Sequence, residues 1–136
     1  MGVDFRRPRS LAEVAGLMDE VPDAFDQLVA EFLDEFYLHP DRRQSMIAEE
    51  PQRLVPLRDA WLGAVAEHLA RRWDLEIPPW VDQPHRFLNR AHFAGGLESL
   101  KAILLAESPL AFRKRQIFVE AEPLRRARMP RDNAAE

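Results

Sequence analysis

The sequence predicts an all-α protein, a single compact bundle of about five principal helices with an irregular proline-rich strap at residues 74–96. Residues 25–37 carry apolar side chains at helical spacing at every step, and residues 56–73 form the longest uninterrupted amphipathic pattern. The only β-prone run is at residues 117–119, where we expect an extended segment without a partner strand. These patterns favour helices and predict no β-sheet.

The length and composition predict one domain that folds without disulfide bonds. A chain of 136 residues can bury a core of its own. We expect an N-terminal arm at residues 1–9, one helical domain at residues 10–127 and a disordered tail at residues 128–136. Cysteine is absent, which favours a cytoplasmic location, and no apolar run approaches the roughly eighteen residues of a membrane span, so no membrane association is expected.

Two helices are predicted before Pro40. Ser10 and Glu13 have the spacing of a capping box, so a first short helix should cover about residues 11–20. Asp23 should cap a second helix that ends near residue 38. The second helix should bury a long stripe made of Phe25, Leu28, Val29, Phe32, Leu33, Phe36 and Tyr37. A third helix at residues 40–50 has little apolar surface, and we expect it to pack shallowly.

The helix at residues 56–73 is expected to form the centre of the core. Its apolar stripe consists of Leu57, Trp61, Val65, Leu69 and Trp73. Two indole rings on one stripe are a large apolar surface, so we expect the second helix and the helix after Gly96 to bury both. Ile47 and Met46 are the only strong apolar residues of the preceding helix.

Past the central helix, the sequence predicts short elements. We expect a short helix at residues 84–89 within the strap and a longer helix at residues 97–107. The apolar stripe of the longer helix consists of Leu97, Leu100, Ile103, Leu104 and Ala106. Ser108 followed by Pro109 has the form of a new helix cap, so a helical turn should cover residues 109–114.

A basic segment near the C-terminus is the most function-like surface in the sequence. Residues 10–50 carry a net charge of −9 and residues 113–136 a net charge of +3, counted from their acids and bases. The predicted partner-binding residues are Arg113, Lys114, Arg115, Ile117, Phe118, Arg125 and Arg126. Arginine beside large apolar residues is typical of protein interfaces, whereas phosphate contact and an ordinary solvated surface are the alternatives.

No catalytic, metal or cofactor motif is present in the sequence. The five glycines are too scattered for a phosphate loop. Glu31, Glu35 and His39 share a helical ridge, but they lie opposite the apolar stripe and no matching ligands are evident on other helices. We therefore expect no metal site and no cofactor. A pocket beneath the strap, lined by Trp80, Phe87 and Phe93, is a further alternative that would suit a small molecule.

Residues 77–119 resemble the C-terminal domain of bacterial Xre-type regulators. The matching positions are Pro78, Trp80, Pro84, Phe87, Leu88, Glu107, Ser108, Pro109, Phe112, Arg113, Arg115, Ile117, Phe118 and Val119. Such regulators resemble antitoxin components of toxin–antitoxin loci, and the resemblance implies partner binding. No helix-turn-helix precedes residue 77, so DNA reading is not implied.

These observations together predict a non-catalytic protein-binding module. The resemblance implies an antitoxin-like or regulatory component of a bacterial toxin–antitoxin-type locus, with a protein partner such as a toxin, or with a second copy of the chain. The alternatives are nucleic-acid binding through the basic C-terminal segment and small-molecule sensing by the helical domain.

Overall fold

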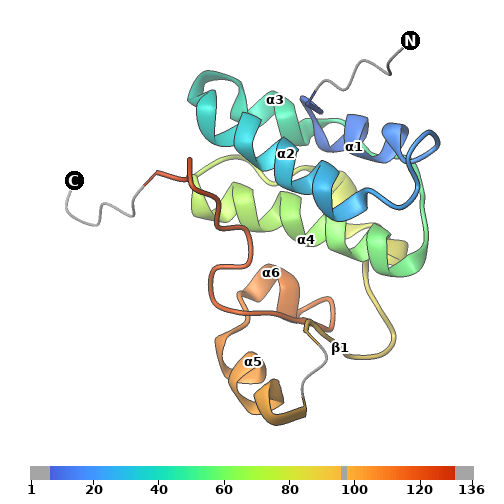
Figure 1. Cartoon of the computed structure of the whole chain (residues 1–136), viewed down its shortest axis with the longest axis vertical. Coiled ribbons are helices and arrows are strands. Elements are labelled where there is room, and N and C mark those ends of the chain that lie inside the picture. Colours follow the sequence, from blue (N-terminus) through green and yellow to red (C-terminus); the bar gives the residue numbers. More distant parts are fainter. Residues whose placement is uncertain (1–6, 96–97, 131–136) are drawn as a thin grey trace. The chain divides into compact units, whose positions relative to one another are not determined.

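The computed structural model describes residues 7–95 and 98–130 and confirms the all-α class. Helices make up 56% of the structure and strands 3%; Figure 1 shows their arrangement along the chain. The chain divides into two compact units. Unit 1 comprises residues 1–52 and 125–136, and unit 2 comprises residues 53–124. Residues 1–6 of the predicted arm, residues 131–136 of the predicted tail, and residues 96 and 97, where the strap ends and the next helix should begin, lie outside the described residues.

Unit 1 contains α1 (Leu11–Leu17), α2 (Phe25–Leu38), the 3₁₀ helix η1 (Pro40–Arg42) and α3 (Arg43–Ala48). The Ser10 hydroxyl accepts a hydrogen bond from the Glu13 amide at 3.0 Å, which confirms the predicted cap of α1. All seven residues of the predicted α2 stripe are buried. Asp23, however, is not the α2 cap: Ala24 holds that position and makes no side-chain capping bond.

The packing of α3 corrects the expectation of a shallow contact. Met46 and Ile47 are both buried. Arg43 reinforces this packing because its guanidinium donates to the carbonyl oxygens of Phe36 at 3.0 Å and Tyr37 at 3.2 Å. These carbonyls lie in the last turn of α2, where they have no partner within the helix. Two well-buried side chains and one arginine therefore replace the longer apolar stripe that the sequence lacks.

Unit 2 is built on α4 (Pro56–Arg72), which has proline in its first turn as predicted. The helix packs against α6 (Leu110–Arg113) and the 3₁₀ helices η2 (Pro79–Asp82) and η3 (Pro84–Arg86). The prediction that both tryptophans of this helix are buried is wrong, because the side chains of Trp61 and Trp73 are only half-buried. Trp61 meets the Phe112 ring edge-on at 5.4 Å, and Arg72 lies 4.8 Å from the centre of the Trp73 ring. Small residues in the middle of α4 instead allow close packing on most sides.

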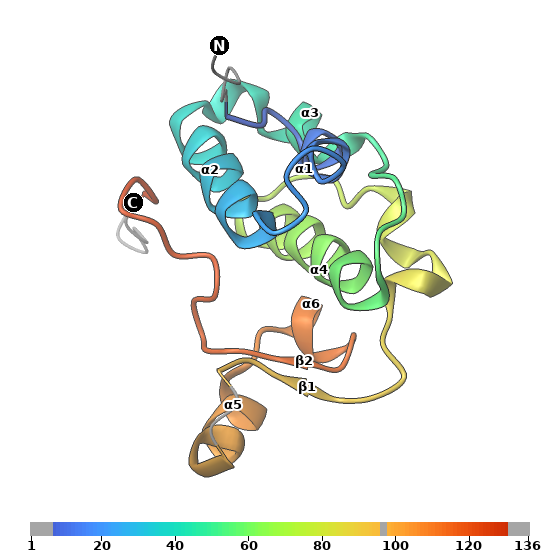
Figure 2. The same ribbon diagram turned by 45° about the vertical axis from the view of Figure 1, so that its right-hand side comes forward.

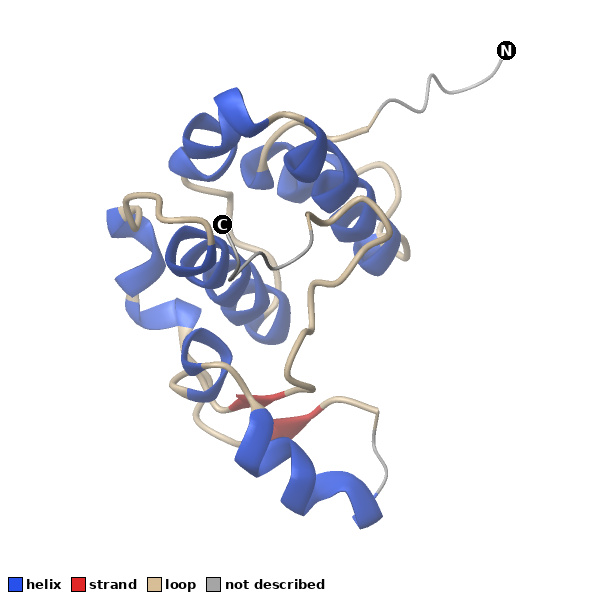
Figure 3. Cartoon of the chain, turned by 90° about the vertical axis from the view of Figure 1, so that its left-hand side faces the viewer, coloured by secondary structure: helices blue, strands red, loops and turns tan. Residues whose placement is uncertain are grey.

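The remainder of unit 2 departs from the sequence prediction at the strands. Strand β1 (His92–Phe93) pairs in parallel with β2 (Ile117–Phe118), so the run expected to have no partner does have one. Between the strands lie η4 (Glu98–Leu100), α5 (Lys101–Glu107) and α6. Figures 2 and 3 show α6 and α5 on opposite sides of the strand pair. The strand pair and α6 therefore separate α5 from α4, which α5 was expected to bury. Within the described residues, no helix is both long and apolar enough to cross a bilayer.

Candidate protein-binding surface

Unit 2 contains a buried charge layer made of Asp59, Glu67, Arg86 and Arg115, each at most 2% exposed. Glu67 accepts from Arg115 at 2.8 Å, Lys114 at 3.0 Å and Arg71 at 2.9 Å. Burial by itself raises the pKa of Glu67, but these three hydrogen bonds outweigh it, and the pKa lies below its usual value. Glu67 is therefore the anion that holds α6 and the following residues onto α4.

Arg115 is fixed from several directions. Besides Glu67, it donates to the carbonyl oxygens of Ala111 at 2.8 Å and Val81 at 2.7 Å, and its guanidinium lies 4.6 Å from the centre of the Phe87 ring. The sequence prediction that Arg115 belongs to an exposed binding surface is therefore wrong. The Arg115 side chain instead joins α4, the strap and α6 within unit 2.

Asp59 and Arg86, the other two residues of the buried charge layer, join α4 to the strap. Arg86 approaches Asp59, with 3.7 Å between its Nη1 and the Asp59 Oδ1, and its guanidinium lies 4.9 Å from the centre of the Trp80 ring. Asp59 also accepts from the Leu54 amide at 2.6 Å, which fixes the entry to α4. Burying a charge is unfavourable unless it is paired, and the layer satisfies this condition within unit 2.

The other predicted partner-binding residues divide into two groups. Ile117 and Phe118 are buried in β2, so the structure contradicts their proposed exposure. Lys114 is exposed but bonded to Glu67, and Arg126 forms a bidentate pair with Asp34 at 2.9–3.0 Å. Arg113 and Arg125 are exposed, and they belong to different units. The basic segment is thus not one continuous free surface of either unit.

The three aromatic rings predicted to line a pocket under the strap each have a packing partner. Trp80 is buried beneath Arg86, Phe87 lies against Arg115, and Phe93 stacks on Phe118 with 4.9 Å between ring centres. Each ring therefore has a different packing neighbour, which gives a shared pocket no support.

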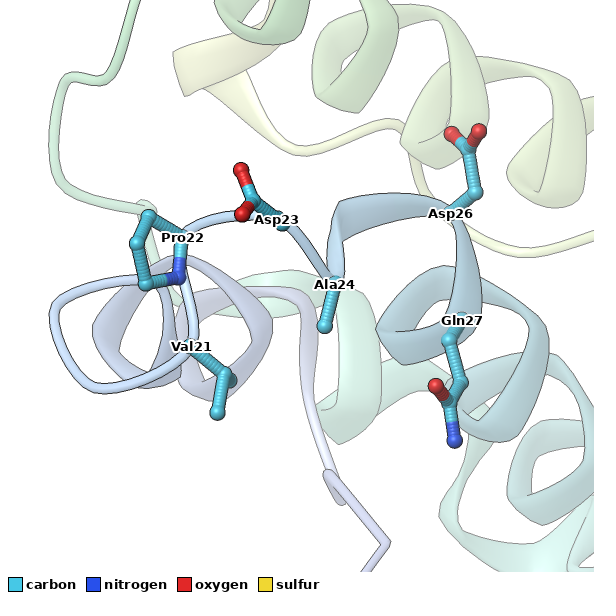
Figure 4. Close-up of a pocket in the computed structure, with 6 residues that line it drawn as sticks. All are labelled: Val21, Pro22, Asp23, Ala24, Asp26 and Gln27. Carbon is cyan, nitrogen blue, oxygen red and sulfur yellow. The ribbon is translucent and has the colours of Figure 1, made fainter.

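A hollow does occur in unit 1, next to the start of α2 (Figure 4). It is lined by Val21, Pro22, Asp23, Ala24, Asp26 and Gln27. Most of these side chains are exposed, which leaves the hollow open to solvent. Such a shallow and open site lacks the enclosed apolar lining typical of small-molecule pockets.

The acidic ridge of α2 forms ion pairs within unit 1. Glu35 accepts from Arg7 at 3.0 Å and lies 3.5 Å from the His39 ring nitrogen, while Asp34 is paired with Arg126. In the part of the chain that the structure describes, no three histidine, aspartate or glutamate side chains are placed to hold a metal ion together.

The most exposed apolar region of unit 2 surrounds α5. We define the α5 apolar surface as four large side chains: Leu100 is 38% exposed, Ile103 50%, Leu105 48% and Leu110 49%. Ala102 and Ala106 between them are exposed as well. The sequence prediction that this helix buries its stripe is therefore wrong for Leu100, Ile103 and Ala106. Leu104 is buried, and Leu97 lies outside the described residues. The physical reason is that, among the described elements, α5 packs mainly against β2 and against η4, which directly precedes it.

A small set of contacts holds α5 in this position. The Ser108 hydroxyl accepts from the Val119 amide at 2.8 Å, and its one hydrogen can be donated to the carbonyl oxygen of Leu104 or of Val119, both within hydrogen-bond distance. Ser108 therefore closes the end of α5 and does not cap α6, where Pro109 is the cap residue. Lys101 lies 5.0 Å above the Phe93 ring, which stacks on Phe118. The helix is thus anchored to the strand pair at both ends while its outer side faces solvent.

Comparison with models of protein families, with curated proteins and with solved structures finds no match to this chain. The role of the α5 apolar surface must therefore follow from its own chemistry. Soluble proteins rarely leave contiguous apolar patches of several hundred Å² uncovered, and those that do use them for binding partners. A helix with apolar residues all round is normally buried, which α5 is not within this chain.

Proposed function

We propose that this chain is a non-catalytic protein-binding module that contacts its partner through the α5 apolar surface. The observation that carries the proposal is the exposure of two large aliphatic side chains on the short helix α5, Ile103 and Leu105, together with Leu100 just before the helix and Leu110 at the start of α6. Covering them removes apolar area from water at about 25 cal/mol per Å², which is the dominant favourable term in most protein association.

The resemblance of residues 77–119 to the C-terminal domain of Xre-type regulators supports the same class of function. The segment includes α5, α6 and both strands. We therefore propose the role of an antitoxin-like or regulatory component, acting in the cytoplasm by binding a protein. Nucleic-acid binding is not favoured, because Arg115, Lys114 and Arg126 already hold acidic partners.

In-cell photo-cross-linking tests the proposal. A photoreactive amino acid replaces Ile103 in one variant and Leu38 of α2, which is 42% exposed, in a matched control. We expect a covalent adduct from position 103 and none above background from position 38. Adding Leu105→Glu to the position-103 variant should abolish the adduct, because a carboxylate cannot be desolvated in an apolar contact without a partner. Equal labelling from positions 103 and 38, with both variants folded, would contradict the proposal.

A further inference from the structure

We propose that the C-terminal end of α4 and the residue that follows α6 form a binding site for a phosphomonoester group, with Arg71 and Lys114 as the residues that bind it. The site goes beyond the protein-binding function and does not rest on it, because α6 and α5 lie on opposite sides of the strand pair (Figures 2 and 3). Three observations carry the proposal: the number of cations around one carboxylate, the hydrogen-bond donors that two of them retain, and the fixed separation of those two.

More positive than negative charge meets at Glu67. Its Oε1 accepts from Arg115 at 2.8 Å, and its Oε2 accepts from both Arg71 at 2.9 Å and Lys114 at 3.0 Å. Three cations therefore share one carboxylate, which is itself only 1% exposed. The exposed Asp82 acts electrostatically on Arg115, but in the described part of the chain it forms no ion pair with Arg71 or Lys114. The Arg71–Lys114 end of this cluster thus keeps an excess of positive charge.

Arg71 and Lys114 retain hydrogen-bond donors at the surface, since their side chains are 47% and 32% exposed. Within the described residues, Arg71 donates through Nε alone, and Lys114 uses one ammonium hydrogen for Glu67. About six N–H groups are thereby left for an anion. A phosphomonoester offers three acceptor oxygens and a charge between about −1.5 and −2 at neutral pH, whereas a carboxylate offers two oxygens and a single charge. Both the donors and the charge therefore favour phosphate.

Glu67 holds the two exposed cations next to each other. Because both donate to the same oxygen, the Arg71 Nε and the Lys114 Nζ are at most about 6 Å apart, a distance at which like charges repel. The shared carboxylate offsets only part of this repulsion, and a phosphate that contacts both cations would offset the remainder. The two side chains are already held in place by Glu67, so binding would cost little further conformational entropy.

A nucleic-acid backbone fits this pair of cations less well than a single phosphate group. A nucleic acid carries one charge per phosphate along its length, and proteins bind it through a row of several cations. Of the arginines beside the pair in sequence, Arg115 is buried and Arg72 lies 3.8 Å from Glu122. The two remaining exposed cations that contact Glu67 suit one phosphate group and not a strand.

Titration of the purified full chain with inorganic phosphate tests the site. The ionic strength is held constant with chloride, and two-dimensional NMR follows the Arg71 Nε–H signal and the Lys114 amide. We expect both signals to move saturably with a Kd on the order of 1 mM, because two partly exposed cations hold a small anion weakly. Acetate at the same ionic strength should bind several-fold more weakly. Absence of a saturable change with phosphate, or equal affinity for acetate, would overturn the proposal.

Variants that remove one charge locate the site. Arg71→Gln, followed at the Lys114 amide, and Lys114→Gln, followed at the Arg71 Nε–H signal, should each weaken phosphate binding roughly tenfold or more, because a charge-assisted hydrogen bond is lost. Both variants keep the Glu67–Arg115 pair and should remain folded, which the same spectra report. Arg113→Gln removes the same charge from the exposed residue before Lys114 and should leave binding nearly unchanged. An equal loss in Arg113→Gln would mean that phosphate senses only net charge, which would overturn the site.

Two esters of the same chemistry identify the source of the phosphate group. Free phosphoserine represents a small molecule, and a phosphoserine peptide represents a modified protein. Equal affinities support the site and assign it to a small phosphate ester, whereas at least tenfold tighter binding of the peptide supports the site and assigns it to a phosphorylated protein. Failure of both esters to bind would overturn the assignment to a phosphomonoester. Leu105→Glu in the α5 apolar surface should leave phosphate binding unchanged, so this site and the proposed function are tested separately.

Discussion

Gly63 lies between the two arginines of the buried charge layer. A Cβ at this position would be 3.0 Å from the Arg115 Nε and 3.1 Å from the Arg86 Cβ. Neither neighbour can move freely, since Arg115 is held by Glu67, Ala111 and Val81. The missing side chain of Gly63 is therefore what allows a buried guanidinium to lie directly on α4.

Gly63→Ala should destabilise the protein even though alanine favours helices. The gain in helix propensity is about 1 kcal/mol, whereas crowding in a packed interior costs about 1–3 kcal/mol, so we expect a net loss of up to about 2 kcal/mol. Gly16→Ala is the matched control, because Gly16 is an exposed α1 residue with nothing within 4 Å of a Cβ. It should stabilise the protein by up to about 1 kcal/mol. Urea unfolding monitored by circular dichroism measures both, and stabilisation by Gly63→Ala would contradict the assigned packing.

At the scale of elements, Ser108 is the joint between α5 and β2. Its single hydroxyl connects the carbonyl of Leu104 with both backbone groups of Val119, which follows directly on β2. The side chain is buried, so water cannot replace these bonds without local opening. Ser108 therefore fixes the C-terminal end of α5 relative to the strand pair, while Lys101 and Phe93 hold the other end.

Ser108→Ala should loosen this joint without unfolding unit 2. Leaving the Val119 amide buried and unpaired costs about 1–3 kcal/mol. We expect hydrogen exchange at the Val119 amide to accelerate by roughly tenfold or more, while amides in the centre of α4 keep their protection. Ser99→Ala, at an exposed serine of η4, serves as the control and should leave exchange at Val119 unchanged. Uniform acceleration across α4 and β2 would show that Ser108 stabilises the whole unit and not this joint.

The elements differ in how far the sequence could predict them. The α2 helix was predictable because its seven apolar residues form one face and all of them are buried. The burial of Asp59 and Glu67 was not predictable, since an acidic residue in a helix is normally assigned to its solvent-exposed side. Their partners Arg86 and Arg115 are 27 and 48 residues away, and a local pattern carries no record of such pairs.

The sequence predicted an apolar binding surface but not the residues that form it. Periodicity identified the apolar residues of α5, but it does not reveal whether another element covers them. Periodicity therefore assigned Leu100 and Ile103 to the core, while the alternation of basic and apolar residues assigned the exposed contact to Ile117 and Phe118. The burial observed is the reverse of both. The short parallel pairing of β1 with β2 decides the outcome, because it buries β2 and leaves α5 on the outside.

At the scale of the whole molecule, unit 1 is assembled from both ends of the chain, with unit 2 inserted between residues 52 and 125. Arg126 links the C-terminal segment to α2 through two hydrogen bonds to Asp34, at 3.0 and 2.9 Å. The partners are 92 residues apart in sequence. This ion pair is therefore a direct measure of whether the C-terminal segment is docked in unit 1.

The ionisation of Asp34 reports this docking. The hydrogen bonds from Arg126 hold the pKa of Asp34 below its ordinary value of 3.8. A carboxyl whose pKa is lower in the folded than in the unfolded chain stabilises the fold fully above its unfolded pKa. That contribution is lost as the pH falls through the lower, folded value. Arg126→Ala should therefore cost up to about 1 kcal/mol at pH 7, as expected for a partly exposed pair, and almost nothing once Asp34 is protonated.

A carboxyl-detected NMR titration of Asp34 checks this expectation. The pKa should move upward in Arg126→Ala, because its principal hydrogen-bond donor is removed. Arg125→Ala changes the same charge one residue earlier, at an exposed side chain, and should leave the pKa and the acid limb of the stability curve nearly unchanged. An equal upward shift in both variants would mean that Asp34 senses only the net charge of the segment. In that case the C-terminal segment is not docked by this pair, and unit 1 closes without it.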